Sequence, residues 1–139
     1  RGFAAFALGE LGAAVSARGA AAVASLTEDS AEFVRRNAAD ALGTIPSRSR
    51  KVIPALTRLL ADESAQVRFD AANALARQGR AARPATDALV AALGDDNRYV
   101  RNHTIEALKR IGTPQATAAL FDFLEVSRWC PITTKETTF

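Results

Sequence analysis

The sequence is poor in the residues that form most metal and catalytic sites. Its 139 residues include one cysteine (Cys130), one histidine (His103) and no methionine. A single cysteine excludes an internal disulfide framework and any multi-cysteine zinc or iron–sulfur site. A single histidine argues against an all-protein transition-metal site and leaves no imidazole for a second catalytic role. We therefore expect no catalytic residues, no metal ion and no cofactor.

Long apolar runs and a strong charge imbalance are also missing. No uninterrupted apolar stretch approaches the roughly 20 residues of a membrane-spanning helix, so the sequence excludes an integral membrane protein. The 18 basic residues nearly balance the 15 acidic ones, which argues against nucleic acid as a partner. Aromatic residues make up only 6%, whereas alanine occurs 31 times. Alanine is the best helix former, so this composition predicts closely packed helices.

The chain opens with Arg1 and has no initiator methionine and no secretory signal pattern. We expect a piece of a longer protein, located in the cytoplasm.

Three ten-residue segments repeat without gaps, beginning at Val34, Val67 and Val100. Each starts with Val-Arg and has Ala-Leu at its eighth and ninth positions, and the starting points are 33 residues apart both times. A shortened fourth copy covers residues 4–9, 34 residues before its counterpart. Chance does not reproduce such a register, so the sequence predicts a repeat architecture.

Each repeat unit is expected to contain two helices. Val67, Ala71 and Leu75 recur at helical spacing on one side of the second segment, and an apolar-periodic stretch precedes each segment, as in residues 52–60 and 84–93. The unit is thus an A helix, a short turn containing aspartate, and a B helix, and stacked units share a core. The expected boundaries are a half repeat at 1–15, repeats at about 16–46, 47–79 and 80–112, a final helix at 113–125, and an irregular tail at 126–139.

The repeated pattern resembles the HEAT repeat. It places Asp29, Asp62 and Asp95 in the turns, each followed by the Val-Arg pair and then by the alanine- and leucine-rich B helix. The resemblance covers residues 1 to about 125 and is greatest for the short HEAT-like repeats of phycobilisome lyases and bacterial scaffold proteins. It implies an all-α, right-handed solenoid of about seven helices whose B helices line the concave side. It does not imply one activity, because this fold serves many.

Aspartate and arginine recur six residues apart in every repeat, as Asp29/Arg35, Asp62/Arg68 and Asp95/Arg101. A specific binding site would not be copied three times. We interpret these pairs as structural, with each arginine fastening the turn between the two helices of its own repeat.

The outward side of the B helices is the candidate binding site. Stacking aligns these positions into columns, and Phe69 occurs where the neighbouring repeats have Arg36 and Asn102. An aromatic side chain on a polar surface is a suitable anchor for a protein partner. We expect Phe69 to be exposed and to contribute little to folding. The full candidate set, called here the B-helix face, is Phe6, Arg36, Asp40, Phe69, Asn73, Arg77, Asn102, Glu106 and Arg110.

The remaining features of the sequence do not indicate an enzyme. His103 aligns with Asn37 and Asp70, so we interpret it as a residue flanking the B-helix face. The basic run at 48–51 could touch nucleic acid or an acidic partner but is more typical of a solvated loop. In the threonine-rich tail, Trp129 and Ile132 either form a lid over the last helix, the alternative we favour, or lead into another domain.

Together these features favour a non-enzymatic scaffold that binds a protein or peptide along the B-helix face. The alternative is a subunit or fragment of a bilin (phycobilisome) lyase or of another HEAT-repeat enzyme, which rests on the resemblance alone. The first B helix has no preceding A helix, so its apolar side predicts self-association through this edge.

Overall fold

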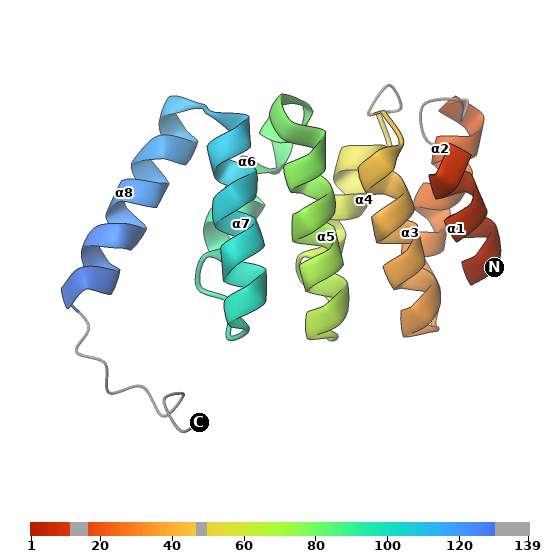
Figure 1. The fold of residues 1–139 in the computed structure, drawn as a ribbon, viewed down its shortest axis with the longest axis horizontal. Helices are drawn as coiled ribbons and strands as arrows, with labels where there is room; N and C mark the ends of the chain where they lie inside the picture. Colours follow the sequence, from red (N-terminus) through yellow and green to blue (C-terminus); the bar gives the residue numbers. More distant parts are fainter. Residues whose placement is uncertain (12–16, 47–49, 130–139) are drawn as a thin grey trace.

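The computed structural model describes residues 1–11, 17–46 and 50–129. The B helices α1, α3, α5 and α7 lie side by side in one layer, with the A helices α2, α4 and α6 behind them and α8 next to α7 (Figure 1). Two 3-10 segments, η2 (Leu26–Glu28) and η3 (Gly79–Ala85), connect helices. The α-helices are α1 (Gly2–Leu11), α2 (Ala17–Ser25), α3 (Glu32–Thr44), α4 (Val52–Leu59), α5 (Ala65–Gln78), α6 (Thr86–Ala92), α7 (Arg98–Ile111) and α8 (Pro114–Trp129).

This arrangement confirms the all-α solenoid expected from the repeats. The described residues contain eight α-helices rather than about seven, because the half repeat contributes one, each full repeat two, and α8 the last. No helix in the described ranges combines the length and apolar character needed to cross a membrane.

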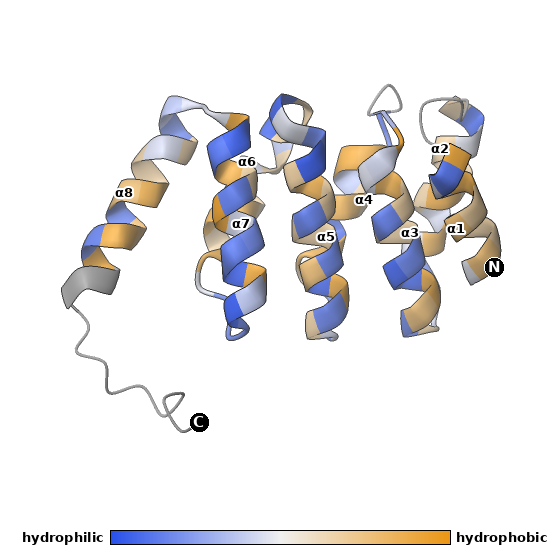
Figure 2. Cartoon of the chain, in the orientation of Figure 1, coloured by the Kyte–Doolittle hydropathy of each residue, from blue (hydrophilic) through white to orange (hydrophobic). Residues whose placement is uncertain are grey.

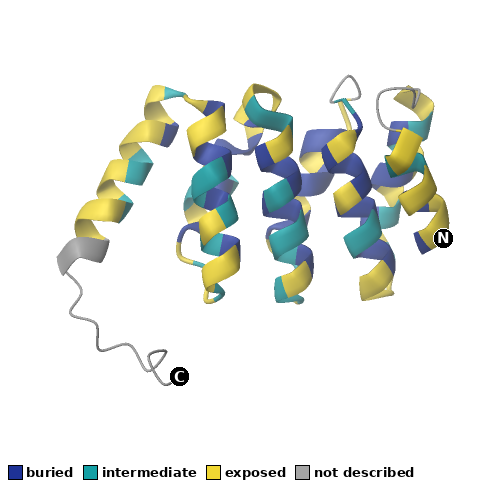
Figure 3. Cartoon of the chain, viewed as in Figure 1, coloured by how far each residue is buried: buried dark blue, intermediate teal, exposed yellow. Residues whose placement is uncertain are grey.

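The core between the A and B helices contains one fully buried leucine from each of the helices α3 to α7. Leu42, Leu75 and Leu108 from the B helices and Leu56 and Leu89 from the A helices are all fully buried. Figure 3 shows buried residues along the array on the B helices and on the A helices behind them, with exposed residues mainly on the outer sides. Because each pair of helices covers the next, the core is continuous from repeat to repeat.

Glycine and alanine let the B helices approach closely. A Cβ atom added to Gly43 would lie 2.9 Å from the Cα atom of Ala74 on the next B helix, and one added to Gly9 would lie 2.9 Å from Cα of Ala41. Real Cβ atoms essentially never come so near to backbone. The small residues therefore fix the spacing of α1, α3 and α5, and with it the spacing of the side chains on the B-helix face.

The C-terminal boundary differs from the expected one. The irregular tail was expected to start at Val126, but α8 continues to Trp129. No glycine or proline occurs in this stretch until Pro131. The sequence therefore has no helix-breaking residue between Val126 and Trp129. Residues 130–139, with Cys130 and Ile132, lie outside the described part of the chain, so the lid stays a prediction.

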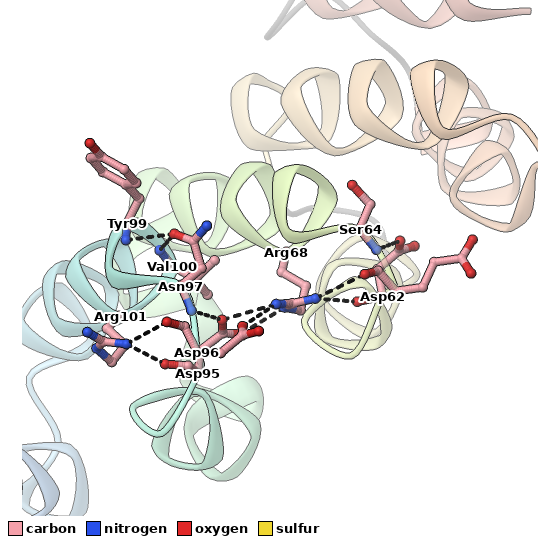
Figure 4. Close-up of polar contacts among 10 residues, drawn as sticks. Asp62, Ser64, Arg68, Asp95, Asp96, Asn97, Tyr99, Val100 and Arg101 are labelled. Atoms are coloured by element: carbon pink, nitrogen blue, oxygen red, sulfur yellow. Dashed lines mark hydrogen bonds and ion pairs between the residues drawn. The ribbon is translucent and has the colours of Figure 1, made fainter. Parts of the chain in front are cut away.

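The repeated arginines bind across repeats as well as within them (Figure 4). Nη1 of Arg68 donates to the carbonyl oxygens of Asp62 and Glu63 in its own turn, at 2.9 and 3.2 Å. Its Nε and Nη2 donate to the Asp95 carboxylate of the next turn, at 2.8 and 3.2 Å, and Nη2 also reaches Asp96. Each arginine thus fastens the turn of its own repeat, as expected, but it does so by donating to carbonyl oxygens. The carboxylate that it binds belongs to the next repeat.

The ion pair between successive turns recurs along the stack and forms what we call the arginine ladder, Arg1–Asp29, Arg35–Asp62 and Arg68–Asp95. Each aspartate also accepts a backbone N–H two residues ahead, for example Ser64 N–H to Asp62 Oδ1 at 2.9 Å. Burial raises the pKa of Asp62, but hydrogen bonds from Arg35 and the Ser64 N–H outweigh it and hold the pKa below its ordinary value. The Asp62 carboxylate is therefore ionised at neutral pH, and its ion pair with Arg35 links successive turns electrostatically.

Candidate partner-binding face

The B-helix face is a surface of mixed charge whose charged groups are held by ion pairs. Arg36 on α3 donates from Nε to the Asp70 carboxylate on α5, at 2.9 Å. Further up the same two helices, Arg77 on α5 pairs with Asp40 on α3. These two bridges join neighbouring repeats, because the 33-residue period places side chains of adjacent B helices at the same height. They fix the positions of the charged groups on this face.

On α7 the pairing is local. Arg110 donates to Glu106 one helical turn away, at 2.7 Å, and both side chains are about half exposed. This hydrogen bond lowers the pKa of Glu106 below its ordinary value. Burial has the opposite effect on Asp70 and raises its pKa, although Arg36 offsets part of the change. Asn102 is exposed and Asn73 half-buried, so both present amide groups on this surface.

Phe69 is not the exposed side chain that the sequence suggested. It is half-buried, and its ring packs edge-on against His103 of α7, with the ring centroids 4.6 Å apart. A helical projection of α5 shows that Phe69 faces away from its own core, but it cannot show the neighbouring helix that covers it. His103 does flank the face as expected, and its imidazole ring holds Phe69 in place.

A shallow cleft opens beside this ring pair, at the N-terminal ends of α5 and α7. It measures about 210 Å³ and is lined by Ala65, Gln66, Phe69, Asn97 and Tyr99. The Asn97 side chain caps α7 by accepting the backbone N–H groups of Tyr99 and Val100. The cap fixes the start of the helix and therefore the position from which Tyr99 projects.

Tyr99 is the candidate residue that the sequence reading missed. Its side chain is 54% exposed, and the Arg98 guanidinium lies 4.9 Å from its ring centroid. The repeat alignment began at the valine that follows, so the position just before it was not compared. Extending the register by one residue gives Phe33, Gln66 and Tyr99 at the 33-residue offset, which would have revealed two aromatic side chains out of three.

The opposite end of the face carries a second aromatic group. Phe6 and Phe3 on α1 are 53% and 81% exposed, and the Phe3 ring lies edge-on to Phe33 of α3 at 6.1 Å. In Figure 2, α1 is mostly hydrophobic, whereas α3, α5 and α7 carry hydrophilic bands. All nine residues of the B-helix face thus come from the four aligned B helices α1, α3, α5 and α7.

A family model for HEAT repeats matches residues 1–76 and 54–129, which together span the whole described stack. The chain belongs to the HEAT repeat family.

Two solved structures have a fold similar to that of this chain. A crystal structure of an engineered protein is similar over 88% of this chain, with 26% sequence identity and a TM-score of 0.63. A second crystal structure of an engineered protein is similar over 86% of the chain, with 23% identity and a TM-score of 0.61, and supports the fold alone. This chain spans 61% of the length of each. A search of curated proteins found no match.

The chemistry available on this HEAT-repeat face is that of recognition by shape and charge. Among the described residues, no group of three or more histidine, cysteine, aspartate or glutamate side chains could hold a metal ion. The groups that the structure brings together are a cleft with two aromatic side chains, two amides and three ion pairs. They offer an apolar contact flanked by donors and acceptors in fixed positions.

Proposed function

We propose that this HEAT-repeat chain is a non-enzymatic scaffold that binds a protein or peptide segment along the B-helix face. The observation that carries the proposal is the cleft lined by Phe69 and Tyr99 at the N-terminal ends of α5 and α7, where the Arg98 guanidinium lies over the Tyr99 ring. Tyrosine is enriched among the residues that dominate binding energies at protein interfaces. Its ring supplies apolar area, and its hydroxyl group can still hydrogen-bond at the rim.

The surroundings of the cleft favour an ordered binding surface. Phe69 is held by His103, and Asn97 caps the helix that carries Tyr99. A side chain already fixed before binding loses less conformational entropy when a partner arrives. The Arg36–Asp70 and Arg77–Asp40 bridges extend the same surface toward α3. A partner could lay an apolar residue in the cleft and direct polar groups along these bridges.

The test uses a peptide selected from a random library against the wild-type chain, with affinity measured by fluorescence anisotropy. Tyr99→Ala should weaken binding by at least about tenfold, as expected for an aromatic anchor. The matched control is Phe121→Ala, which removes an aromatic ring of 64% exposure from α8. We expect the control to bind like the wild type. Equal affinities for Tyr99→Ala and wild type, or a library that yields no binder, would contradict the proposal.

Phe69→Ala needs a stability measurement beside the affinity measurement, because its ring packs against His103. We expect a loss of binding together with a modest fall in melting temperature. Arg77→Ala should weaken binding with little effect on folding, since its partner Asp40 is exposed. If both variants bind the peptide as tightly as wild type, the site lies elsewhere on the chain.

The second function considered from the sequence is a subunit of a bilin lyase or of another HEAT-repeat enzyme. It rests on the resemblance of the repeats, and the matching family model is the general one for HEAT repeats. Co-expression with a bilin separates the two functions. A chain that retains pigment, seen by its absorbance, would support the lyase, whereas a colourless chain would favour the scaffold.

A further inference from the structure

A second cleft lies on the A-helix layer, away from the B-helix face. It opens between α2 and α4, measures about 340 Å³, and is lined by Ala21, Ala24, Ser25, Glu28, Arg50, Lys51, Pro54 and Arg58. Figure 1 shows α2 and α4 in the layer behind the B helices. Three of the lining side chains are cationic and one is anionic, so the cleft carries a net charge of +2.

The repeat architecture provides an internal control for this cleft. The next groove, between α4 and α6, measures about 300 Å³ and has no cationic lining residue; it is lined by Thr57, Leu60, Ala61, Ala88, Ala91, Ala92, Gly94 and Asp95. At the 33-residue offset, Glu28 corresponds to Ala61 and Arg58 to Ala91, and both alanines line the second groove. The groove between the next two A helices therefore forms with alanine in place of both Glu28 and Arg58. The stacking of A helices does not require this ion pair.

The charged side chains of this cleft are exposed to solvent, so a dissolved ligand can reach them. Arg58 Nη2 lies 2.8 Å from Glu28 Oε1, and the two side chains are 59% and 67% exposed. The bridge connects α4 to η2 and holds the guanidinium group at the cleft. Arg50 and Lys51, just before α4, add their charges to the same cleft. Arginine forks bind planar or tetrahedral oxyanions through paired N–H groups.

We propose that this cleft binds a phosphate monoester, either as a small molecule or as a phosphorylated side chain of a peptide. A phosphate monoester carries about −1.5 to −2 charges at neutral pH, which matches the +2 charge of the lining residues. The cleft volume leaves room for the group that carries the phosphate. This site is independent of the proposed function of the B-helix face.

The experiment titrates the isotope-labelled chain with inorganic phosphate and with a phosphoserine peptide, followed by amide chemical shifts. Sodium chloride at equal ionic strength and the unphosphorylated peptide are the controls. We expect saturable shifts around Ala24 and Arg58 with the phosphate probes only. Saturation by inorganic phosphate alone identifies a small-molecule site, and saturation by the peptide identifies a phosphorylated side chain. Shifts that do not saturate, or that chloride reproduces, would overturn the proposal.

Two variants separate binding from a merely structural role of the ion pair. Arg58→Ala and Glu28→Ala break the same bridge, and both introduce the residue that the next groove already has. We expect Arg58→Ala to weaken phosphate binding by about tenfold and Glu28→Ala to strengthen it, because the second variant removes only the negative charge. Arg83→Ala, an exposed arginine at the repeat position of Arg50, should leave the affinity unchanged. If both bridge variants shift the affinity in the same direction, or if Arg83→Ala weakens it as much as Arg58→Ala, the proposal fails.

Discussion

The arginine ladder leads to the most specific stability prediction for this chain. In Arg68→Ala, the Asp62 and Glu63 carbonyl oxygens lose their donor, and the Asp95 carboxylate loses its partner. The side chains of Arg68 and Asp95 are only 14% and 8% exposed, so water can replace these bonds only in part. Removing one partner of a buried ion pair costs about 3–5 kcal/mol, and the nearby solvent lowers this to about 2–4 kcal/mol.

The free energy of unfolding would be measured by urea denaturation, followed by far-ultraviolet circular dichroism. Arg68→Lys tests geometry, because lysine keeps the charge but lacks the planar fork that reaches carbonyl and carboxylate together. We expect Lys to recover less than half of the loss. The matched control is Arg110→Ala, which breaks an ion pair that is about half exposed within α7 and should change the free energy of unfolding much less than Arg68→Ala does.

A comparison of Arg68→Ala with Arg110→Ala tests whether the arginine ladder links the repeats energetically. If Arg68→Ala destabilises the chain no more than Arg110→Ala, the ladder does not link the repeats energetically. A double-mutant cycle with Asp95→Asn adds a second check, because partners in direct contact should show a coupling energy of about 0.5–3 kcal/mol. Independent, additive effects would refute the cross-repeat bond as the source of the loss.

The remaining predictions concern the core, the helix contacts, acid and association. Leu75 is fully buried, so Leu75→Ala should cost about 2–5 kcal/mol, and an unchanged melting temperature would show that the helical phase is wrong. Gly43→Ala should cost about 1–2 kcal/mol in urea denaturation despite the better helix propensity of alanine, because the new Cβ collides with the Ala74 backbone. Folding lowers the pKa of Asp62, so the contribution of this carboxylate to stability is complete above about pH 4 and is lost as the pH falls through the pKa of the folded state. The urea midpoint of the wild type should therefore drop more steeply with acid than that of Asp62→Asn. The exposed apolar edge around Phe3 should promote association with a second copy, and light scattering that finds only monomer at high concentration would count against it.

The fold was predictable because two independent periods agree in the sequence. Helical spacing within each segment identifies the buried side, and the 33-residue offset fixes how the segments stack. Leu75 and its repeat equivalents Leu42 and Leu108 are buried for this reason. These features are local or repeated, so one sequence is sufficient to find them.

Features that depend on a neighbouring helix were less accessible. Arg68 lies six residues from Asp62 but binds the carboxylate of Asp95, 27 residues away, and local spacing alone favours the wrong pair. Phe69 faces away from its own core, yet His103 of the next repeat covers it. The cleft beside Tyr99 requires two helix ends to be placed side by side. Such contacts between repeats need the stacked geometry, not only the period.

The central claim is that a partner binds the B-helix face at the cleft between Phe69 and Tyr99, and amide chemical-shift mapping tests it most directly. The isotope-labelled chain would be titrated with the library-selected peptide, and the shifts would be assigned residue by residue. The account predicts that the largest shifts fall on α5 and α7, around Phe69, Asn73 and Tyr99. Largest shifts on the A helices or on α8, with those three residues unaffected, would contradict it.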